Sequence, residues 1–480
     1  MASSPARGHA RDILAAAIRG AEPRRAVDKA LREHDQCVKT LARVDRASSV
    51  SDFERVLLTG QGKAAVQMCT AALQTLAEHA PAVSDAICGG LVVTKHGHAT
   101  QEERDVLAAR SIRIAEAGHP VPDADGVAGT EALLALVKDA DERTLVLNFI
   151  SGGGSALTCV PAKGLTLHDI QTTVNLLLGS GAPIEDMNTV RRHLTRFQGG
   201  RFAGAIAPGT VLSLILSDVV GDPLEVIAGG STSPDPTTFA DCAEILNDEA
   251  LGIASSVPAA VWDFLKQPQS ALEELETCKP GSSALARASN LVVASNRESL
   301  REAKIKAEAL GYNTRILTSQ MQGEARHAAT FLAGIAADAR DQGTFGPLPA
   351  CILVGGETTV TLSHASAPNA SENVDAETGS DPVGGRNQEF ALAAALALRN
   401  EPRITILAAG TDGQDGPCDA AGAVIDGEVC KSRQDLARAK RHLARHDSYG
   451  FFRDSSMHIL TGPTGTNVMD LCVVLVDEEK

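Results

Sequence analysis

The sequence Arg55-Val-Leu-Leu-Thr-Gly-Gln-Gly-Lys63-Ala-Ala-Val-Gln-Met68 predicts a buried strand, a glycine turn and a helix in immediate succession. Gly60 and Gly62 interrupt the strand, and an apolar run from Ala64 opens the helix. Such a turn leaves unpaired N–H groups facing a cavity, where the helix dipole attracts anions. Lys63 adds a positive charge. The stretch therefore predicts either a phosphate site or a tight turn with a solvent-facing lysine.

Length and composition limit the class of protein. A chain of 480 residues, 44% of them apolar, can bury a large core in two or three domains. The net charge of −16 disfavours nucleic-acid binding, which requires a basic face. No apolar run reaches the roughly 18 residues that span a bilayer. We expect no membrane association, a cytoplasmic location and a first helix over residues 13–18 in place of a transit peptide.

The ten cysteines form no C-x-x-C pair, which indicates reduced thiols and argues against a zinc site. His96 and His98 follow a predicted strand over 89–94 and could ligate a metal, but a loop pair without a third ligand is more often structural.

Two further strands end in polar loops. The strand predicted over 144–150 runs into Ser151-Gly-Gly-Gly-Ser155, which either admits a ligand close to the backbone or forms a simple glycine-rich bend. The strand predicted over 210–216 ends at Ser217-Asp218, where open α/β sheets bind ligands. Asp218 is thus a candidate for metal binding or proton abstraction.

Four arginines and one histidine lie within residues 191–201, after Asn188. In an acidic protein this cluster is either a solvated helix face or a cradle for phosphate or carboxylate. Arg191 and Arg196 do not share a helical face, so only part of the cluster could converge on one ligand.

The second half repeats the α/β pattern after a Pro/Gln/Ser-rich junction over 267–283. Strands are predicted over 291–294, 314–317 and 350–354, with helices over 298–310 and 324–340 between them. A polar loop, 363–381, is expected to act as a mobile lid. It delivers Gly384-Gly385-Arg386-Asn-Gln-Glu389 to a helix, and a strand over 404–409 leads into Gly410-Thr-Asp412-Gly-Gln-Asp-Gly416.

Known motifs narrow the chemistry. Gly60-Gln-Gly-Lys-Ala-Ala65 satisfies G-x-G-x-x-A, but the next strand ends in Thr94-Lys95 where a dinucleotide site expects an acid for the ribose. Neither a Walker A motif nor a G-x-S-x-G elbow occurs. Glycine turns with a lysine, an arginine and aspartates suit phosphoryl transfer, in which cations neutralise developing charge and carboxylates hold magnesium.

Eight motifs in order, over almost the whole chain, resemble those of the class II glycerate 2-kinases, whose second domain is the MOFRL domain. They are Gly60–Ala65, Gly118-His-Pro-Val-Pro-Asp123, Ser151–Leu157, Asn188–Leu194 with Gly199-Gly-Arg201, Ser217–Pro223, Gly384–Glu389, Gly410–Gly416 and Thr461-Gly-Pro-Thr-Gly-Thr-Asn467. The resemblance implies a Rossmann-like parallel-sheet N-terminal domain (1–284) and a smaller mixed α/β C-terminal domain (285–480). It implies Mg²⁺- and ATP-dependent phosphorylation of D-glycerate to 2-phosphoglycerate in an interdomain cleft. The oligomeric state, a homodimer included, stays open.

The resemblance also assigns site residues. Lys63 and Arg386 match the family's active-site lysine and arginine, and Asp218 and Asp412 are assigned by their positions at strand ends as catalytic and metal-binding carboxylates. The candidate substrate- and nucleotide-binding residues are Gly60, Gly62, Ser151, Gly152, Gly153, Gly154, Ser155, Asn188, Arg191, Gly385, Glu389 and Asn467.

One departure concerns a loop: Gly229-Gly-Ser-Thr232 stands where the family usually has S-G-P-T, which bears on loop geometry and substrate preference. The alternative functions are an NAD(P)H-dependent hydroxypyruvate reductase, which the missing ribose acid disfavours, and a non-catalytic small-anion sensor. The sensor is disfavoured because Lys63, Arg386 and both aspartates are present.

Overall fold

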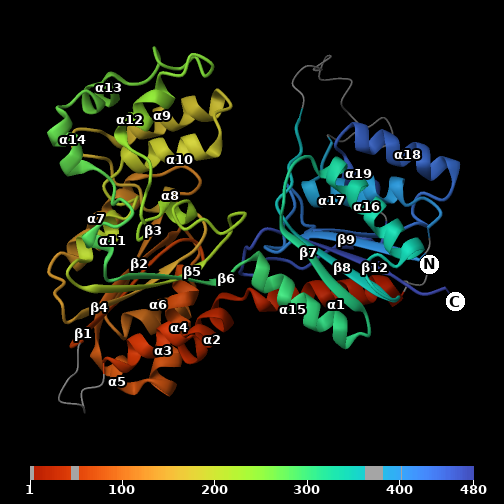
Figure 1. The fold of residues 1–480 in the computed structure, drawn as a ribbon, viewed down its shortest axis with the longest axis horizontal. Helices are drawn as coiled ribbons and strands as arrows, with labels where there is room; N and C mark the ends of the chain where they lie inside the picture. Colours follow the sequence, from red (N-terminus) through yellow and green to blue (C-terminus); the bar gives the residue numbers. More distant parts are fainter. Residues whose placement is uncertain (1–4, 45–52, 363–381, 402, 454, 480) are drawn as a thin grey trace. The chain divides into compact units, whose positions relative to one another are not determined.

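The computed structural model describes residues 5–44, 53–362, 382–401, 403–453 and 455–479 (Figure 1). The chain forms two compact units. The parallel-sheet unit is Pro23–Val293, and the mixed-sheet unit combines Met1–Glu22 with Ala294–Lys480. These units differ from the expected ranges 1–284 and 285–480, because the first helix groups with the C-terminal half. The expected lid, 363–381, lies outside the described residues.

The parallel-sheet unit is built on six strands in the order β3-β2-β1-β4-β5-β6. The pairs β1–β2, β2–β3, β1–β4 and β4–β5 are all parallel. This is the strand order of a Rossmann fold. The strands are β1 Arg55–Gln61, β2 Ile87–Lys95, β3 Ile112–Ala117, β4 Thr144–Ile150, β5 Thr210–Leu216 and β6 Ala288–Ala294.

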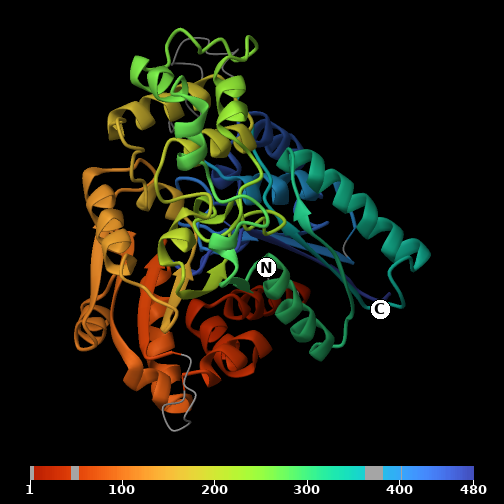
Figure 2. The same cartoon turned by 60° about the vertical axis from the view of Figure 1, so that its left-hand side comes forward.

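Helices cover this sheet and extend one end of it. α4 contacts β1, β2 and β4, whereas α7 packs on β2 and β3. Helices α9, α10, α12 and α13 share a separate apolar core, and in Figures 1 and 2 they gather at the end of the unit away from α2–α5. The helices are α2 Pro23–Glu33, α3 Asp35–Ala42, α4 Ala65–His79, α5 Pro81–Ala86, α6 Gln101–Ala108, α7 Ala124–Val137, α8 Gly154–Leu157, α9 Leu167–Gly179, α10 Ile184–His193, α11 Arg201–Ile206, α12 Phe239–Leu246, α13 Ala259–Leu265 and α14 Gln269–Leu275.

The mixed-sheet unit has the strand order β11-β10-β9-β12-β8-β7. Only β7 and β8 pair in parallel; the other four pairs are antiparallel. The strands are β7 Asn313–Met321, β8 Ala350–Gly356, β9 Ile404–Gly410, β10 Gly422–Asp426, β11 His458–Ile459 and β12 Asp470–Val476. The helices are α1 Pro5–Gly20, α15 Asn296–Ala309, α16 Ala325–Gln342, α17 Arg386–Ala397, α18 Arg433–Ala444 and α19 Ser448–Phe452.

Alternation along β12 explains why this unit needs the chain's first helix. Leu471, Val473 and Leu475 face one core, and the intervening Cys472 and Val474 face the other. α16 and α17 cover the second face. α1 and α15 cover the first, with Ala6, Ala10, Ile13, Leu14 and Ala17 buried along one stripe of α1 (Figure 1). The N-terminal helix therefore closes a core that the C-terminal half builds.

The strands predicted from Arg55 and over 144–150, 210–216 and 350–354 are all present, and the first of them, β1, extends to Gln61. The ten cysteines are free thiols in the described coordinates. No helix in the described ranges is both long and apolar enough to cross a membrane.

Candidate functional site

Two glycine loops predicted separately lie against each other at the carboxyl edge of β1 and β4. Gly62 has φ +121°, and a Cβ there would lie 2.3 Å from the Ser151 carbonyl oxygen, so only glycine permits this approach. The Lys63 N–H donates to the Gly152 carbonyl at 3.0 Å, and the Ala64 N–H donates to Ser151 Oγ at 2.9 Å. The parallel sheet thus joins loops almost 90 residues apart.

These contacts correct one expectation. The turn was predicted to present unpaired N–H groups to an anion, but Gly62 donates to the Val93 carbonyl at 3.1 Å and Ala65 donates to the Gly62 carbonyl at 3.3 Å. The N–H groups of residues 62–65 therefore all have protein partners. Within residues 62–65, the group left to attract an anion is the Lys63 side chain.

Asp218 lies directly behind the same loop. A Cβ on Gly152 would come within 1.8 Å of Asp218 Oδ2, so the carboxylate packs against bare backbone. Burial raises the pKa of Asp218, while the nearby Lys63 ammonium lowers it. The structure thus brings together Lys63, the loop 151–155 and Asp218, which the sequence assigned from three separate strand ends.

His119 is a neighbour that the sequence did not assign, although its motif was recognised. The Cβ position of Gly153 lies 3.1 Å from His119 Nε2 and 3.3 Å from Lys63 Cε. Burial, then the positive charges of Lys63, Lys95 and His98, lower the pKa of His119 to about 4. The imidazole is therefore neutral at pH 7 and can donate or accept one hydrogen bond beside the loop.

A cavity of about 370 Å³ opens next to Gly153 and is confined to the parallel-sheet unit. Gly153, Ser155 and Arg191 line it, as does His119. Burial lowers the pKa of Arg191, whose Nη1 lies 3.5 Å from Asn188 Oδ1. Four residues predicted to bind substrate or nucleotide thus lie on or next to one cavity, whereas Gly154 packs against Ala228 below the loop.

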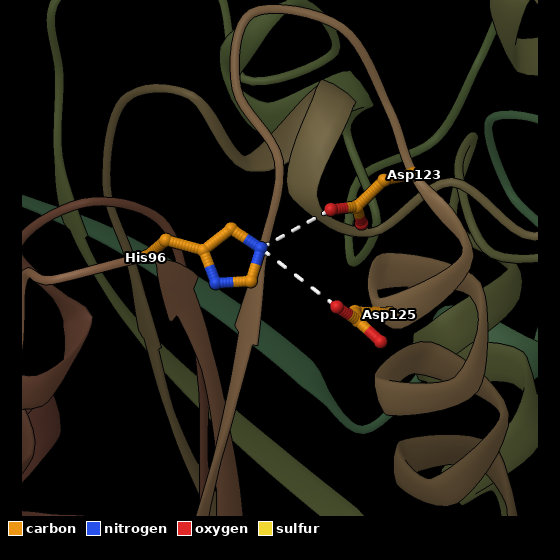
Figure 3. A group of neighbouring side chains, drawn as sticks. All are labelled: His96, Asp123 and Asp125. Atoms are coloured by element: carbon orange, nitrogen blue, oxygen red, sulfur yellow. Dashed lines mark hydrogen bonds and ion pairs between the residues drawn. The ribbon is translucent and has the colours of Figure 1, made fainter.

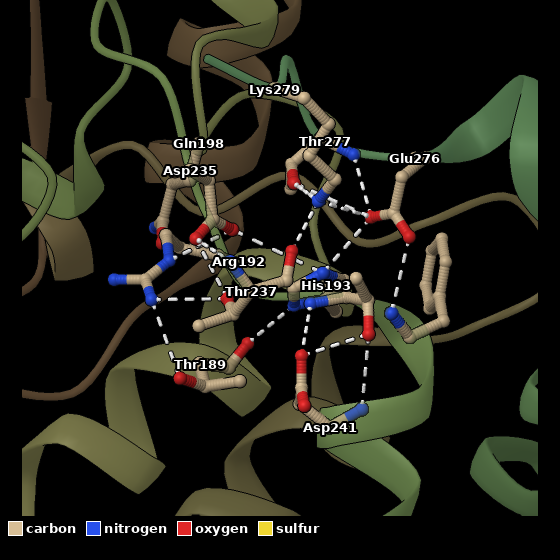
Figure 4. A network of polar contacts seen from close by, with 12 residues as sticks. Thr189, Arg192, His193, Gln198, Asp235, Thr237, Asp241, Glu276, Thr277 and Lys279 are labelled. Carbon is tan, nitrogen blue, oxygen red and sulfur yellow. Dashed lines mark hydrogen bonds and ion pairs between the residues drawn. The ribbon is translucent and has the colours of Figure 1, made fainter.

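The other basic residues of the cluster have structural contacts. Arg192 forms a buried ion pair with Asp235 at 3.1 Å, and His193 Nε2 lies 3.0 Å from Glu276 Oε1 (Figure 4). Burial would raise the pKa of Glu276, but hydrogen bonds from His193 and the Thr277 N–H hold it at about 2. Arg196 pairs with Glu131 and Arg201 donates to three carbonyl groups. α10 ends at His193, so the cluster is not one helix face.

The loop that departs from the family pattern closes over this region without proline. Gly229 and Gly230 adopt φ of +72° and +60°, and their carbonyl groups accept the N–H groups of Gly199 and Gly200 at 2.9 and 2.7 Å. Ser231 Oγ accepts a hydrogen bond from Gln61 Nε2 at 2.5 Å. Two left-handed glycines therefore shape this turn, and Ser231 ties it to the end of β1.

In the mixed-sheet unit, a buried carboxylate holds Arg386. Asp470, 1% exposed, accepts hydrogen bonds from Arg386 Nε at 2.6 Å and Nη2 at 3.0 Å, and Glu357 Oε1 lies 3.1 Å from Nη1. Burial lowers the pKa of Arg386, but the bonds to Asp470 outweigh it and raise the pKa overall. Asp470 pairs in register with Gly356 and Gly410, which places it at the edge where β8 and β9 end.

A second buried carboxylate caps the helix that Arg386 begins. Asp415 accepts the N–H groups of Asn387 and Gln388 at 3.0 and 2.9 Å, and a Cβ on Gly385 would lie 2.3 Å from Asp415 Cγ. Arg386 follows a glycine turn at the start of a helix, as Lys63 does. Here the protein's own carboxylate accepts two N–H groups of the helix's first turn, and Gly385 makes room for it.

The remaining predicted residues of this unit have separate environments. Asp412 is half-buried, its Oδ1 accepts the Gln414 N–H at 3.0 Å, and its charge raises the pKa of Asp470 after the larger effect of burial. Asn467 Oδ1 accepts the Met469 N–H at 3.0 Å. Glu389 is buried in ion pairs with Arg326 at 2.6 Å and with His446 at 2.8 Å.

One group of three side chains in the described residues has the spacing of metal ligands. His96 Nε2 lies 3.2 Å from Asp123 Oδ2 and 3.8 Å from Asp125 Oδ2 (Figure 3). The His96–His98 pair considered from the sequence does not form, because His98 Nδ1 faces the Lys63 carbonyl at 3.3 Å. Asp123 also caps α7 through the Gly126 N–H, which gives this group a structural role. The two carboxylates predicted from the sequence to bind metal, Asp218 and Asp412, belong to different units.

Comparisons with known proteins agree with this architecture. A family profile described as a domain of unknown function (DUF4147) matches residues 9–266, and the MOFRL family profile matches residues 350–470. The glycerate 2-kinase of Pyrococcus horikoshii is 35% identical over 98% of this chain and 97% of its own. A putative hydroxypyruvate reductase of Agrobacterium vitis is 37% identical over 88% and 87%.

The crystal structure of glycerate kinase from Thermotoga maritima superposes with a TM-score of 0.80 at 35% identity, covering 98% of this chain and 99% of that one. These matches extend through both units. The chain belongs to the class II glycerate 2-kinase family.

Proposed function

We propose that this protein is a glycerate 2-kinase that transfers the γ-phosphoryl group of ATP to the 2-hydroxyl of D-glycerate. The hydroxyl oxygen attacks the γ-phosphorus, the bond to the β,γ-bridging oxygen breaks, and the hydroxyl proton passes to a base. The products are 2-phosphoglycerate and ADP. The observation that carries the proposal is the arrangement of Lys63 and Asp218 against one glycine loop, within the fold of a kinase family.

Each charged group has a role in this reaction. Lys63 neutralises phosphate charge as it develops in transfer, and Arg386 supplies a planar fork of donors for phosphoryl oxygens or the glycerate carboxylate. Asp218, whose pKa burial raises, can accept the hydroxyl proton or hold a metal. Carboxylate oxygens suit Mg²⁺, and Asp218 and Asp412 are the candidates to hold it. Bound magnesium would neutralise the phosphate chain.

A reductase is the second candidate, since relatives carry that name. β2 lies directly beside β1 and ends at Lys95, so a lysine stands where a dinucleotide fold places the acid for the ribose hydroxyls. The two ribose hydroxyls of NAD would therefore lack a carboxylate to accept their hydrogen bonds at this position. This position disfavours NAD, whereas Lys95 could still pair with the 2′-phosphate of NADP.

A coupled assay tests the proposal. ADP release is measured with D-glycerate, L-glycerate and hydroxypyruvate, and enolase coupling identifies 2-phosphoglycerate as product. We expect ADP release with D-glycerate that requires Mg²⁺. NAD(P)H oxidation by hydroxypyruvate, without ADP release from glycerate, would instead establish the reductase.

A further inference from the structure

The cavity beside Gly153 has walls that do not suit glycerate. Its apolar lining includes Pro120, Val121, Ala156, Cys159, Ile170 and Val174. Glycerate carries oxygen on every carbon and would lose hydration in such walls without burying apolar surface. A volume of about 370 Å³ also exceeds what so small an acid fills, and it lies within the range of pockets for larger organic ligands.

The charged groups at the cavity identify the missing part of the ligand. Arg191 lines it from α10, and Asn188 Oδ1, at 3.5 Å, is the only partner that we find for its guanidinium in the described residues. A guanidinium with a free face stacks on aromatic rings and pairs with phosphate. Gly153 lies between the cavity and Lys63: a Cβ placed on Gly153 would be 3.3 Å from Lys63 Cε. The ligand is therefore apolar at one end and anionic at the other.

Gln198 contributes a polar side chain to the cavity wall. It is 1% exposed and donates its amide to the Ser155 carbonyl at 3.0 Å, which fixes the orientation of the amide. Its Oε1 is buried and has no hydrogen-bond partner in the described coordinates. That oxygen lies 2.5 Å from the Cβ position of Gly229, so the Gln198 amide faces the cavity in an orientation that the protein itself fixes.

We propose that this cavity binds the purine base and ribose of the nucleotide, with the phosphates leading past Gly153 to Lys63, and that glycerate binds outside it. The assignment rests on the proposed function for the identity of the reaction, but the cavity itself belongs to one unit. It makes Val174 and Leu178, on α9, determinants of nucleotide affinity.

Two matched pairs of variants of the full chain test this. The first pair places a charge at the cavity rim through Leu178→Asp, since Leu178 is 65% exposed and lines the cavity. Its control is Ile184→Asp, because Ile184 is 50% exposed but does not line the cavity. Val174→Phe fills the cavity, with Thr172→Phe on the same helix as control. We expect both cavity variants to raise KM for ATP about tenfold or more and to leave KM for D-glycerate within about twofold. Neither control should change KM for ATP.

Adenosine separates this proposal from the proposed function, since it carries the base without phosphates. Calorimetry should detect adenosine binding to the wild-type chain, and Val174→Phe should abolish it while thermal unfolding stays cooperative. Adenosine binding without glycerate phosphorylation would retain the cavity assignment and reject the kinase. Two outcomes would overturn the cavity assignment and retain the kinase. In the first, the protein phosphorylates glycerate but the cavity variants raise only the KM for glycerate. In the second, it phosphorylates glycerate but does not bind adenosine.

Discussion

Lys63 and Arg386 are both cations that follow a glycine pair at the edge of a sheet, yet their surroundings differ. In the described residues, Lys63 affects the pKa of Asp218 through its charge, without a hydrogen bond between them. Its flexible side chain lies beside Gly153, which has no side chain of its own. Arg386 is clamped by two direct hydrogen bonds to a buried carboxylate. The first can follow a moving phosphate, whereas the second presents a fixed fork. Similar sequence patterns thus produce one adaptable and one preorganised cation.

Removing either cation should lower the activity more than changing Asp218, Asp470 or His119. Lys63→Ala and Arg386→Ala should each lower kcat by about 10³-fold or more, because each loses a charge that stabilises the phosphoryl transition state. Lys63 belongs to no apolar core and no ion pair in the described residues, so thermal unfolding of Lys63→Ala should change little. Arg386→Ala leaves the buried Asp470 carboxylate without its cation and should lower the melting temperature. Steady-state kinetics with a melting curve for each variant measures both quantities.

Exchanging the cations sharpens this prediction. Arg386→Lys should recover little of the lost activity, since a point charge cannot reproduce two parallel bonds to Asp470, whereas Lys63→Arg should recover more. Near-normal turnover by Arg386→Ala in a folded protein would show that the clamped cation is not catalytic.

Asp218 comes next, with an expected loss of about 10²-fold in kcat for Asp218→Asn, typical of a lost general base. If the carboxylate accepts the hydroxyl proton, the acidic limb of the pH–kcat profile should disappear. If it holds metal, the Mg²⁺ concentration for half-maximal rate should rise instead. An unchanged rate, pH profile and magnesium dependence would remove Asp218 from the site.

Breaking the clamp should have a smaller effect than removing the cation. Asp470→Asn should lower kcat by about tenfold, with less change in KM, because Arg386 remains but loses its fixed orientation. It should also cost about 2 kcal/mol in the free energy of unfolding, the value of a charged hydrogen bond lost. Urea denaturation measures that change, and Asp338→Asn, on the exposed face of α16, is the control. Equal kcat for both variants would argue that Asp470 only stabilises the fold.

The smallest effect concerns pH. The pKa of His119 is lowered from 6.5 to about 4, so the unfolded chain binds a proton that the native state refuses between these values. Native stability should therefore fall as pH drops from 6.5 toward 4. His119→Gln should flatten this dependence, as measured by melting temperature at a series of pH values. Parallel curves for the two proteins would contradict the assignment.

Local pattern accounted for most strands and for the glycine loops at their ends, because alternation, β-branched runs and glycine punctuation act over a few residues. It also located Lys63, Arg386 and Asp218, whose roles stay predictions. It could not assign Asp470 or Asp415, since each meets its partner only through strand and loop contacts made across the sheet. His119 was visible as part of a motif, but its contact with the 151–155 loop was not.

Sequence patterns were enough to establish the α/β class, the order of the elements and the family, because these depend on short-range periodicity and on motifs in order. Packing in three dimensions placed α1 in the core of the mixed-sheet unit, since its apolar stripe could have packed on either sheet. It also paired the N–H groups of residues 62–65, Asn387 and Gln388 within the protein. Hydrogen-bond partners far apart in sequence are chosen by packing, which no local pattern specifies.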